Sequence, residues 1–183
     1  MNVIFLDFDG VIDTFHYYSE EDVERKIQLL GEICNELDCK VVIEAAAKDA
    51  INEKTMEVYG KRVRFIFDLF NKYGIDCIGR TPNVSRGNLS MWKEDEILLY
   101  LLNHPEIDHY CVIDDDDTNN IMHWNESDLD KVRNHLVETI YYSDNPKEEG
   151  LLPEHKNEVR EVLKIENEVK RLALRINNGI IKE

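Results

Sequence analysis

The sequence predicts an α/β fold, a Rossmann-like parallel sheet flanked by helices. Short apolar runs such as Val3–Leu6 and Tyr110–Ile113 are typical of strands that are buried on both faces. Amphipathic stretches separate these runs, and strands separated by helices join through right-handed crossovers into a parallel sheet. At 183 residues the chain is long enough for one five-stranded sheet with helices on both faces, so we predict a single domain over residues 1–183.

The first half of the chain alternates between strands and helices. After the strand at Val3–Leu6, Ser19 and Asp22 are typical of a capping box that opens a helix. That helix carries one apolar stripe, formed by Val23, Ile27, Leu30, Ile33 and Leu37. The pattern then predicts a strand at Lys40–Ala45, a helix at Val58–Tyr73 that Gly74 stops, and a strand at Ile75–Gly79.

The second half continues this alternation. We predict a helix at Lys93–Asn103 that ends before Pro105, the strand at Tyr110–Ile113, and a last strand near His135–Ile140. Beyond Pro153, an apolar stripe predicts a C-terminal helix at about 153–178. Such a stripe can pack on its own sheet or pair with a second copy, so both a monomer and a homodimer are open.

Composition restricts the partners and the location. The chain has 38 acidic and 22 basic residues, and its net charge of −16 disfavours nucleic acid, although residues 61–64 and 170–175 hold local basic clusters. No apolar stretch is long enough to cross a bilayer, and no basic region precedes the first strand, so we expect neither a membrane anchor nor a signal peptide. The four cysteines lack metal-ligand spacing, which favours reduced thiols and a cytoplasmic location.

Acidic residues follow two of the predicted strands. Asp7 and Asp9 end the first strand and are followed by Gly10, where the backbone can turn sharply. A run of four aspartates, residues 114–117, ends the strand at Tyr110–Ile113. The carboxyl edge of a parallel sheet is where ligands bind, and carboxylate oxygens suit Mg²⁺. We therefore predict a metal-assisted phosphoryl-transfer site at this edge, with Asp114 and Asp115 completing the metal shell.

The order of these motifs resembles the haloacid dehalogenase (HAD) superfamily of phosphohydrolases. The resemblance rests on the apolar strand that ends in Asp-Phe-Asp-Gly-Val and the later strand that ends in Ile113-Asp114-Asp115. It implies that Asp7 is a nucleophile that becomes an aspartyl phosphate and that Asp9 is the general acid/base. It also implies that Mg²⁺ is held by Asp7, by the main-chain carbonyl of Asp9, and by Asp114 or Asp115.

Later motifs resemble a narrower group, the HAD domain of multi-activity RNA repair proteins. They include Arg86-Gly87, His104-Pro105-Glu106-Ile107 and His135-Leu136-Val137-Glu138-Thr139, and the resemblance covers most of residues 1 to 160. Full cap domains of the superfamily are inserted after the first or third strand. Neither Ile12–Ser19 nor Arg80–Ser90 is long enough for one, so we expect little or no cap and an open site.

One segment departs from the family pattern. The superfamily has a Ser or Thr at the end of its second strand, where the hydroxyl binds a phosphate oxygen, whereas this chain has Glu44 followed by Ala45-Ala46-Ala47. We expect Gly10, Glu44 and Ala45 to line the substrate-binding part of the site. A glutamate there adds negative charge where phosphate should bind. Alternatively, Thr81 or Ser85 supplies the hydroxyl from a nearby loop.

A cation must offset the phosphate charge, and the sequence offers three. Lys93, at the start of a predicted helix, and Arg86 are the main choices, with Lys48 as a third. Two functions follow. The first is a Mg²⁺-dependent phosphomonoesterase that acts on a phosphorylated substrate of unknown identity. The second is a catalytically weakened relative that binds a phosphorylated ligand or a protein partner through the same pocket.

Overall fold

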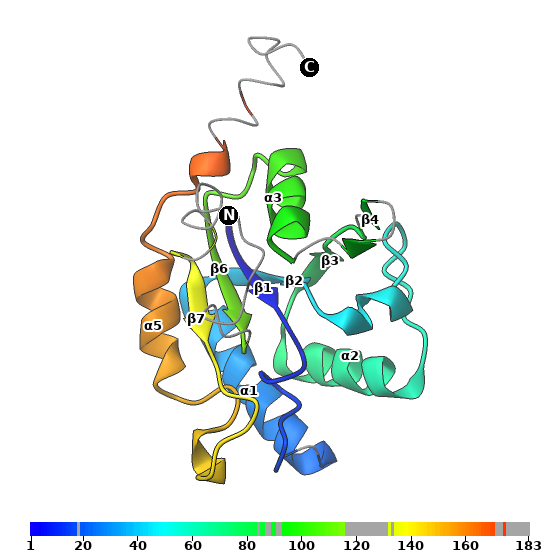
Figure 1. The fold of residues 1–183 in the computed structure, drawn as a ribbon, viewed down its shortest axis with the longest axis vertical. Helices are drawn as coiled ribbons and strands as arrows, with labels where there is room; N and C mark the ends of the chain where they lie inside the picture. The colour runs from blue at the N-terminus through cyan, green and yellow to red at the C-terminus, as the bar shows by residue number, and fades with distance from the viewer. Residues whose placement is uncertain are drawn as a thin grey trace.

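The protein forms a five-stranded parallel sheet in the order β3-β2-β1-β6-β7 (Figure 1). The computed structural model describes residues 1–17, 19–83, 85–86, 89–90, 93–115, 132, 134–170 and 174, with the backbone alone at 85–86 and 89–90. The strands are β1 (Asn2–Leu6), β2 (Cys39–Ile43), β3 (Cys77–Arg80), β6 (His109–Asp114) and β7 (Leu136–Glu138). The predicted fold class is confirmed.

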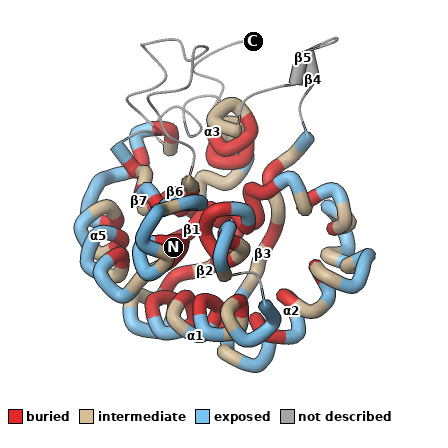
Figure 2. The backbone as a smooth tube through the Cα atoms, turned by 60° about the horizontal axis from the view of Figure 1, so that its bottom comes forward, coloured by how far each residue is buried: buried red, intermediate tan, exposed pale blue. Residues whose placement is uncertain are grey.

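Helices cover both faces of the sheet (Figure 2). On one face lie α1 (Glu20–Leu37) and α2 (Lys61–Tyr73), and on the other lies α3 (Lys93–Asn103). Side chains alternate between the faces, as the two-residue period of a strand requires. Ile4 and Leu6 pack in the cluster with α1 and α2, whereas Val3 and Phe5 pack in the cluster with α3. Even-numbered residues of β1 therefore pack toward α1 and α2, and odd-numbered residues pack toward α3.

Two predicted helix ends match the structure, whereas α2 begins at Lys61 after Gly60, three residues later than the predicted start at Val58. Ser19 caps α1 by accepting a hydrogen bond from the Asp22 amide, and Gly74 ends α2 in the left-handed conformation. The strand boundaries differ by a few residues. β2 begins at Cys39 because Asp38 already turns the chain out of α1 in a left-handed conformation, and β3 begins at Cys77, two residues later than predicted.

Between β3 and α3 the described chain places only a small antiparallel hairpin, formed by β4 (Ser85–Arg86) and β5 (Leu89–Ser90). Two short 3₁₀ helices, η1 (Ala46–Ala50) and η2 (Pro146–Glu148), follow β2 and β7. These segments agree with the prediction that the fold has little or no cap.

The prediction of one continuous helix at about 153–178 was wrong, because the helix in the structure is much shorter. α5 (His155–Val162) ends at Val162, and turns follow it. Asn167 accounts for the break. Its amide donates to the Asp108 carbonyl at 3.1 Å, its side chain donates to the Ile107 carbonyl at 3.0 Å, and its Oδ1 caps a new helical turn at the Lys170 amide. The part of the prediction at 171–173 and 175–178 lies outside the described residues.

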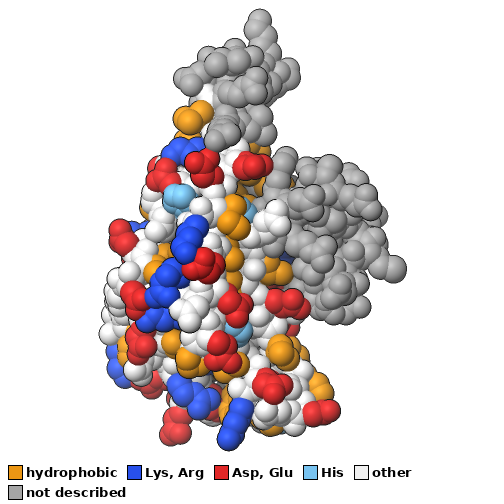
Figure 3. All heavy atoms as spheres, turned by 90° about the vertical axis from the view of Figure 1, so that its left-hand side faces the viewer, with side chains coloured by type: hydrophobic (Ala, Val, Ile, Leu, Met, Phe, Trp, Pro, Cys, Tyr) orange, Lys and Arg blue, Asp and Glu red, His pale blue; other side chains and the backbone are white. Residues whose placement is uncertain are grey.

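Basic side chains on the α5 face are interleaved with acidic ones (Figure 3). Lys156 and Arg160 both form ion pairs with Glu36. In the two basic clusters seen in the sequence, Arg62 pairs with Asp13 and Lys170 pairs with Asp108, while Arg171 and Arg175 lie outside the described residues. Paired cations attract a polyanion weakly, so Arg62 and Lys170 would contribute little to the binding of one.

Two sequence expectations concern cysteines and membranes. Cys34, Cys39, Cys77 and Cys111 are all free thiols, as predicted. Within the described residues, no helix has both the length and the apolar character that a membrane span requires. Burial raises the pKa of the Cys34 thiol to about 12, so this side chain behaves as a core residue rather than as a nucleophile.

His155 at the start of α5 makes stability depend on pH. Its Nδ1 accepts a hydrogen bond from the Leu152 amide at 3.0 Å, and burial lowers its pKa, while Glu158 and Glu154 act in the opposite direction. Below pH 6.5 the His155 ring binds a proton in the unfolded state but resists it in the folded state. The free energy of unfolding therefore decreases as the pH decreases, by at most about 1.4 kcal/mol per pH unit for this group. We expect urea unfolding between pH 7.5 and 5.5 to show a larger loss in the wild type than in His155→Gln. Equal losses in the two proteins would contradict this.

Candidate active site

A row of polar residues follows the central strands at their carboxyl ends. The register pairs Leu6 with Ile43 on one side and with Ile113 on the other, so the next residues, Asp7, Glu44 and Asp114, lie side by side. The ladder continues through this row, because the Asp7 amide donates to the Ile113 carbonyl and the Glu44 amide donates to the Leu6 carbonyl. Strand parity directs all three side chains to the α3 side of the sheet.

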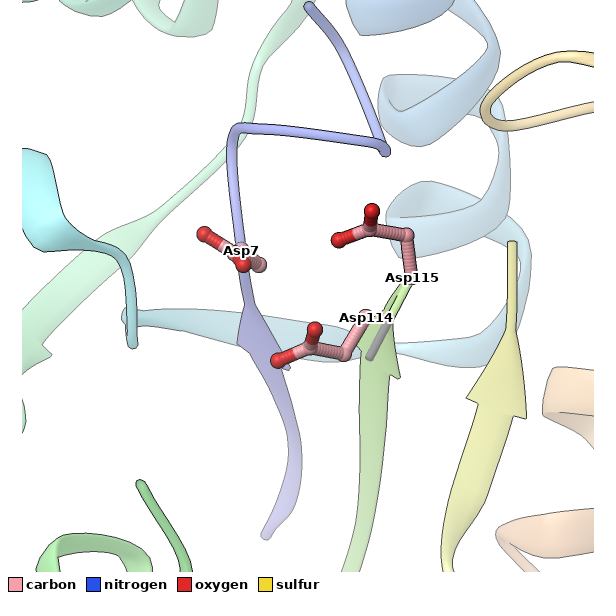
Figure 4. Close-up of side chains that lie close together, drawn as sticks. All are labelled: Asp7, Asp114 and Asp115. Carbon is pink, nitrogen blue, oxygen red and sulfur yellow. The ribbon is translucent and has the colours of Figure 1, made fainter. Parts of the chain in front are cut away.

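Three carboxylates converge in this row (Figure 4). Asp7, Asp114 and Asp115 each offer an oxygen, and these oxygens all lie within 4.8 Å of one another. Asp7 and Asp114 are each only 4% exposed. Asp115 reaches the group because Gly10 has no side chain. A Cβ at Gly10 would lie 2.0 Å from the Asp115 Cγ. We call Asp7, Asp114 and Asp115 the acid cluster.

Lys93 supplies the cation beside the acid cluster. It is the first residue of α3, and its ammonium lies 2.5 Å from Asp7 Oδ2 and 2.9 Å from Asp114 Oδ2. Although burial opposes the charged form, Asp114, Asp7 and Glu44 raise the pKa of Lys93, which keeps it protonated. The structure thus brings Lys93 to the predicted position. Arg86, the other main choice, lies in β4, and its side chain is outside the described residues.

Asp114 disfavours the ionised form of Asp7, because the two buried carboxylates carry like charges. Burial, followed by repulsion from Asp114, raises the pKa of Asp7 to about 7, while Lys93 and the Phe8 amide act against this shift. The Phe8 amide donates to Asp7 Oδ1 at 2.6 Å. Even with Lys93 beside it, Asp7 titrates near neutral pH, and any further positive charge at the acid cluster would favour the ionised form that can act as a ligand or as a nucleophile.

Glu44 also faces Lys93, but one of its oxygens is unsatisfied. Its side chain is 1% exposed, and among the described residues its Oε2 accepts no hydrogen bond, although the Lys93 ammonium lies 4.0 Å away. Its other oxygen lies 3.7 Å from the Lys48 ammonium. Burial is the main reason why the pKa of Glu44 is raised well above its usual range. A buried carboxyl group with an unsatisfied oxygen carries an energetic cost.

Lys48 belongs to a neighbouring network. Its ammonium donates to Thr81 Oγ1 at 3.0 Å and also binds Glu96, a residue of α3. Thr81 is fully buried, and its hydroxyl lies 3.5 Å from the Ile43 carbonyl. Lys48, the third predicted cation, therefore holds η1 against α3, and the Thr81 hydroxyl is engaged in the same network. The side chain of Ser85, the other predicted source of a hydroxyl, lies outside the described residues.

The geometry of this site agrees with a match to a known protein family. The family model for the HAD domain in Swiss Army Knife RNA repair proteins matches residues 3–143. The chain belongs to this family. Neither a search of curated proteins nor a search of solved structures found a match. As a HAD-type domain, the protein falls in a family whose general activity is phosphohydrolysis, and its five-stranded sheet agrees with that fold.

The other predicted residues of the HAD domain lie at different places around the acid cluster. Asp9 is exposed, and its backbone forms an isolated β-bridge with that of Asp13. Its side chain lies outside the acid cluster because the chain turns immediately after Asp7. Gly10 has a positive φ of 76°, as the predicted turn requires. Ala45 packs in the core on the α1 side, so its methyl group cannot line the substrate pocket as we expected. Asp116 and Asp117 lie outside the described residues.

Sequence reasoning missed one contact that shapes the HAD site. Thr139 follows β7, is 2% exposed, and donates a hydrogen bond of 2.8 Å from its hydroxyl to the Gly10 carbonyl. This bond ties the turn after Asp9 to the last strand of the sheet. The sequence could have indicated this contact, because Thr139 is a polar residue directly after β7, and β7 pairs with β6, the strand that ends at Asp114.

The acid cluster fits a divalent cation by its donor chemistry. All of its donors are carboxylate oxygens, which Mg²⁺ prefers, and Asp7, Asp114 and Asp115 leave further positions for water and a substrate phosphate. Lys93, already in contact with Asp7 and Asp114, shows that the cluster attracts positive charge.

Proposed function

We propose that this protein is a Mg²⁺-dependent phosphomonoesterase that acts through an aspartyl phosphate on Asp7. The observation that carries the proposal is the convergence of Asp7, Asp114 and Asp115 beside the Lys93 ammonium, in a chain of the HAD family. When bound by the acid cluster, Mg²⁺ would neutralise charge on the phosphoryl group and orient it.

Each residue then has a defined task. Asp7 attacks phosphorus through a carboxylate oxygen, and the bond from phosphorus to the leaving oxygen breaks. Lys93 lowers the negative charge around Asp7 and the phosphoryl oxygens. Asp9 would protonate the leaving oxygen and later take a proton from the water that hydrolyses the aspartyl phosphate, which requires its exposed side chain to turn toward the acid cluster. Turnover therefore returns Asp7 to its free carboxylate.

The proposal is tested by the hydrolysis of para-nitrophenyl phosphate with Mg²⁺ and with excess EDTA. We expect release of nitrophenol that requires Mg²⁺ and that is restored when the metal is added back. Hydrolysis that is equally fast in EDTA would overturn the metal-dependent mechanism. A panel of sugar phosphates, nucleotides and phosphorylated RNA ends would then narrow the class of substrate.

A specific observation supports a second candidate function, a weakened enzyme that binds a phosphorylated ligand or a protein partner. Glu44 places a buried carboxyl group where the HAD family uses a hydroxyl to bind phosphate. If the wild type shows no turnover but binds orthovanadate or inorganic phosphate in the presence of Mg²⁺, this second function is favoured.

Gly10 provides a sharp test of the metal site. In Gly10→Ala the new Cβ would collide with the Asp115 side chain, so we expect roughly tenfold weaker Mg²⁺ binding by isothermal titration calorimetry. Gly60→Ala is a matched control, because Gly60 has a similar positive φ of 81° but a Cβ there would meet nothing within 4 Å. Both variants should lose stability through backbone strain, by about 1–2 kcal/mol. Equal Mg²⁺ affinities in the two variants would show that Asp115 does not bind the metal.

A further inference from the structure

A cavity of about 390 Å³ lies between α1 and the segment that follows β7. None of the acid-cluster residues lines it. α1 covers the face of the sheet opposite α3, whereas the acid cluster lies on the α3 side, so this cavity is separate from the active site. Its walls combine cationic and apolar side chains, among them Tyr17, Arg25, Lys26, Leu29, Lys147 and Leu152.

Lys26 is a buried cation with spare hydrogen-bond donors. Its side chain is 3% exposed, and its ammonium donates to the Thr14 hydroxyl at 2.8 Å. An ammonium has three N–H donors, and among the residues that the structure describes no carboxylate forms an ion pair with this one. The Tyr17 ring centroid lies 5.8 Å from the nitrogen. Burial lowers the pKa of Lys26 to about 8, so most of the population is still charged at pH 7.

The lining of the cavity holds three cations, Arg25, Lys26 and Lys147, and two acids, Glu32 and Glu149. Arg25 lies over the Tyr17 ring, with its guanidinium carbon 5.3 Å from the centroid, and its guanidinium also forms an ion pair of 3.2 Å with Asp22. Of the two acids in the lining, Glu149 is 1% exposed and uses both carboxylate oxygens to bind His16 and the Ser143 amide. Glu32 accepts a hydrogen bond from Gln28. In a chain of net charge −16, a cavity that places the buried Lys26 near Lys147 is a local site where an anion can be bound.

We propose that this cavity binds a small organic anion, whose carboxylate or phosphoryl group contacts Lys26 and whose apolar body packs on Tyr17, Leu29 and Leu152. The anion would use the spare donors of the ammonium and would offset its burial cost. The volume lies within the range of small-molecule pockets, which pair an apolar lining with a few polar groups. This inference does not depend on the proposed phosphatase activity.

The test is a titration of the full chain with benzoate and, separately, with phenylphosphonate, followed by ¹H–¹⁵N NMR in EDTA. Neither probe can be hydrolysed as a phosphate ester, and together they separate carboxylate from phosphoryl ligands. We expect saturable shifts at the amides of Lys26, Leu29 and Leu152, and affinity reduced at least tenfold in Lys26→Met. Lys156→Met, which removes a surface lysine of α5, should bind as the wild type does.

A purely structural Lys26 gives a different result. In that case Lys26→Met would change the midpoint of unfolding, while the probes would shift no amide around the cavity in either protein. Shifts confined to the acid cluster, or equal affinity in the wild type and Lys26→Met, would also overturn the proposal. If Lys26→Met does not fold, Leu29→Trp supplies the second test. Its larger ring should fill the cavity and abolish binding of both probes with Lys26 in place.

Discussion

Replacing Asp7 with Asn should reduce turnover of para-nitrophenyl phosphate by roughly a thousandfold or more, with little effect on folding. The amide side chain has nearly the same shape and can keep the hydrogen bond that Asp7 Oδ1 accepts from the Phe8 amide. It also removes a buried carboxyl group whose pKa is raised by burial and by Asp114, so stability should not fall. What is lost is the carboxylate that attacks phosphorus.

A control and a second measurement separate this chemistry from simple metal loss. Asp68→Asn removes one charge from an exposed position on α2 and should leave turnover unchanged. Rapid acid quench and mass spectrometry of the wild type should locate a phosphoryl group on Asp7. Asp114→Asn should lower activity through metal binding, yet should keep the residue that becomes phosphorylated. Turnover of Asp7→Asn within tenfold of the wild type would eliminate the aspartyl phosphate mechanism.

Restoring a hydroxyl at Glu44 should raise kcat/KM, and we expect roughly a tenfold to hundredfold gain for Glu44→Ser. The substitution removes a buried carboxyl group with an unsatisfied Oε2 and places an O–H donor next to Asp7 in the row. Lys93 would keep its contacts with Asp7 and Asp114, and Lys48 would keep its contacts with Glu96 and Thr81. A bound phosphate would therefore keep both ammonium groups nearby and would no longer face an acidic group at position 44.

Glu44→Gln separates the effect of removing the carboxyl group from the effect of adding the hydroxyl. It removes the acidic group but supplies no hydroxyl, so its kcat/KM should lie between those of the wild type and Glu44→Ser. An inactive wild type with an active Glu44→Ser would favour the weakened relative as the natural state of the protein. If well-folded Glu44→Ser is no faster than the wild type, Glu44 does not limit phosphate binding.

Prediction from the sequence succeeded where a short pattern determines local geometry. The apolar runs before Asp7 and Asp114 indicated which strands lie at the centre of the sheet, because such runs are buried on both faces. The start of α3 at Lys93 was also predicted, and the helix position brought this lysine to the cluster.

The errors arose where tertiary contacts decide the outcome. The sequence predicted that Asp7 and Asp9 both end the first strand, but β1 ends at Leu6, the chain turns at Gly10, and Asp9 is exposed. Ala45 follows Glu44 and therefore packs on the opposite side of the sheet. The break in the C-terminal helix depends on backbone partners of Asn167 at Ile107 and Asp108, far away in the sequence.

The strand order also determines when this site can form during synthesis. β1 is the central strand, yet its neighbours are far along the chain, with Asn2 paired to Cys39 on one side and to His109 on the other. Until β6 leaves the ribosome, one edge of the apolar strand β1 has no partner. Strand pairing between distant parts of a chain is slow, and an unpaired apolar strand edge can aggregate in the meantime. The acid cluster can therefore assemble only after β6 has been synthesised, because Asp114 is the last residue of that strand.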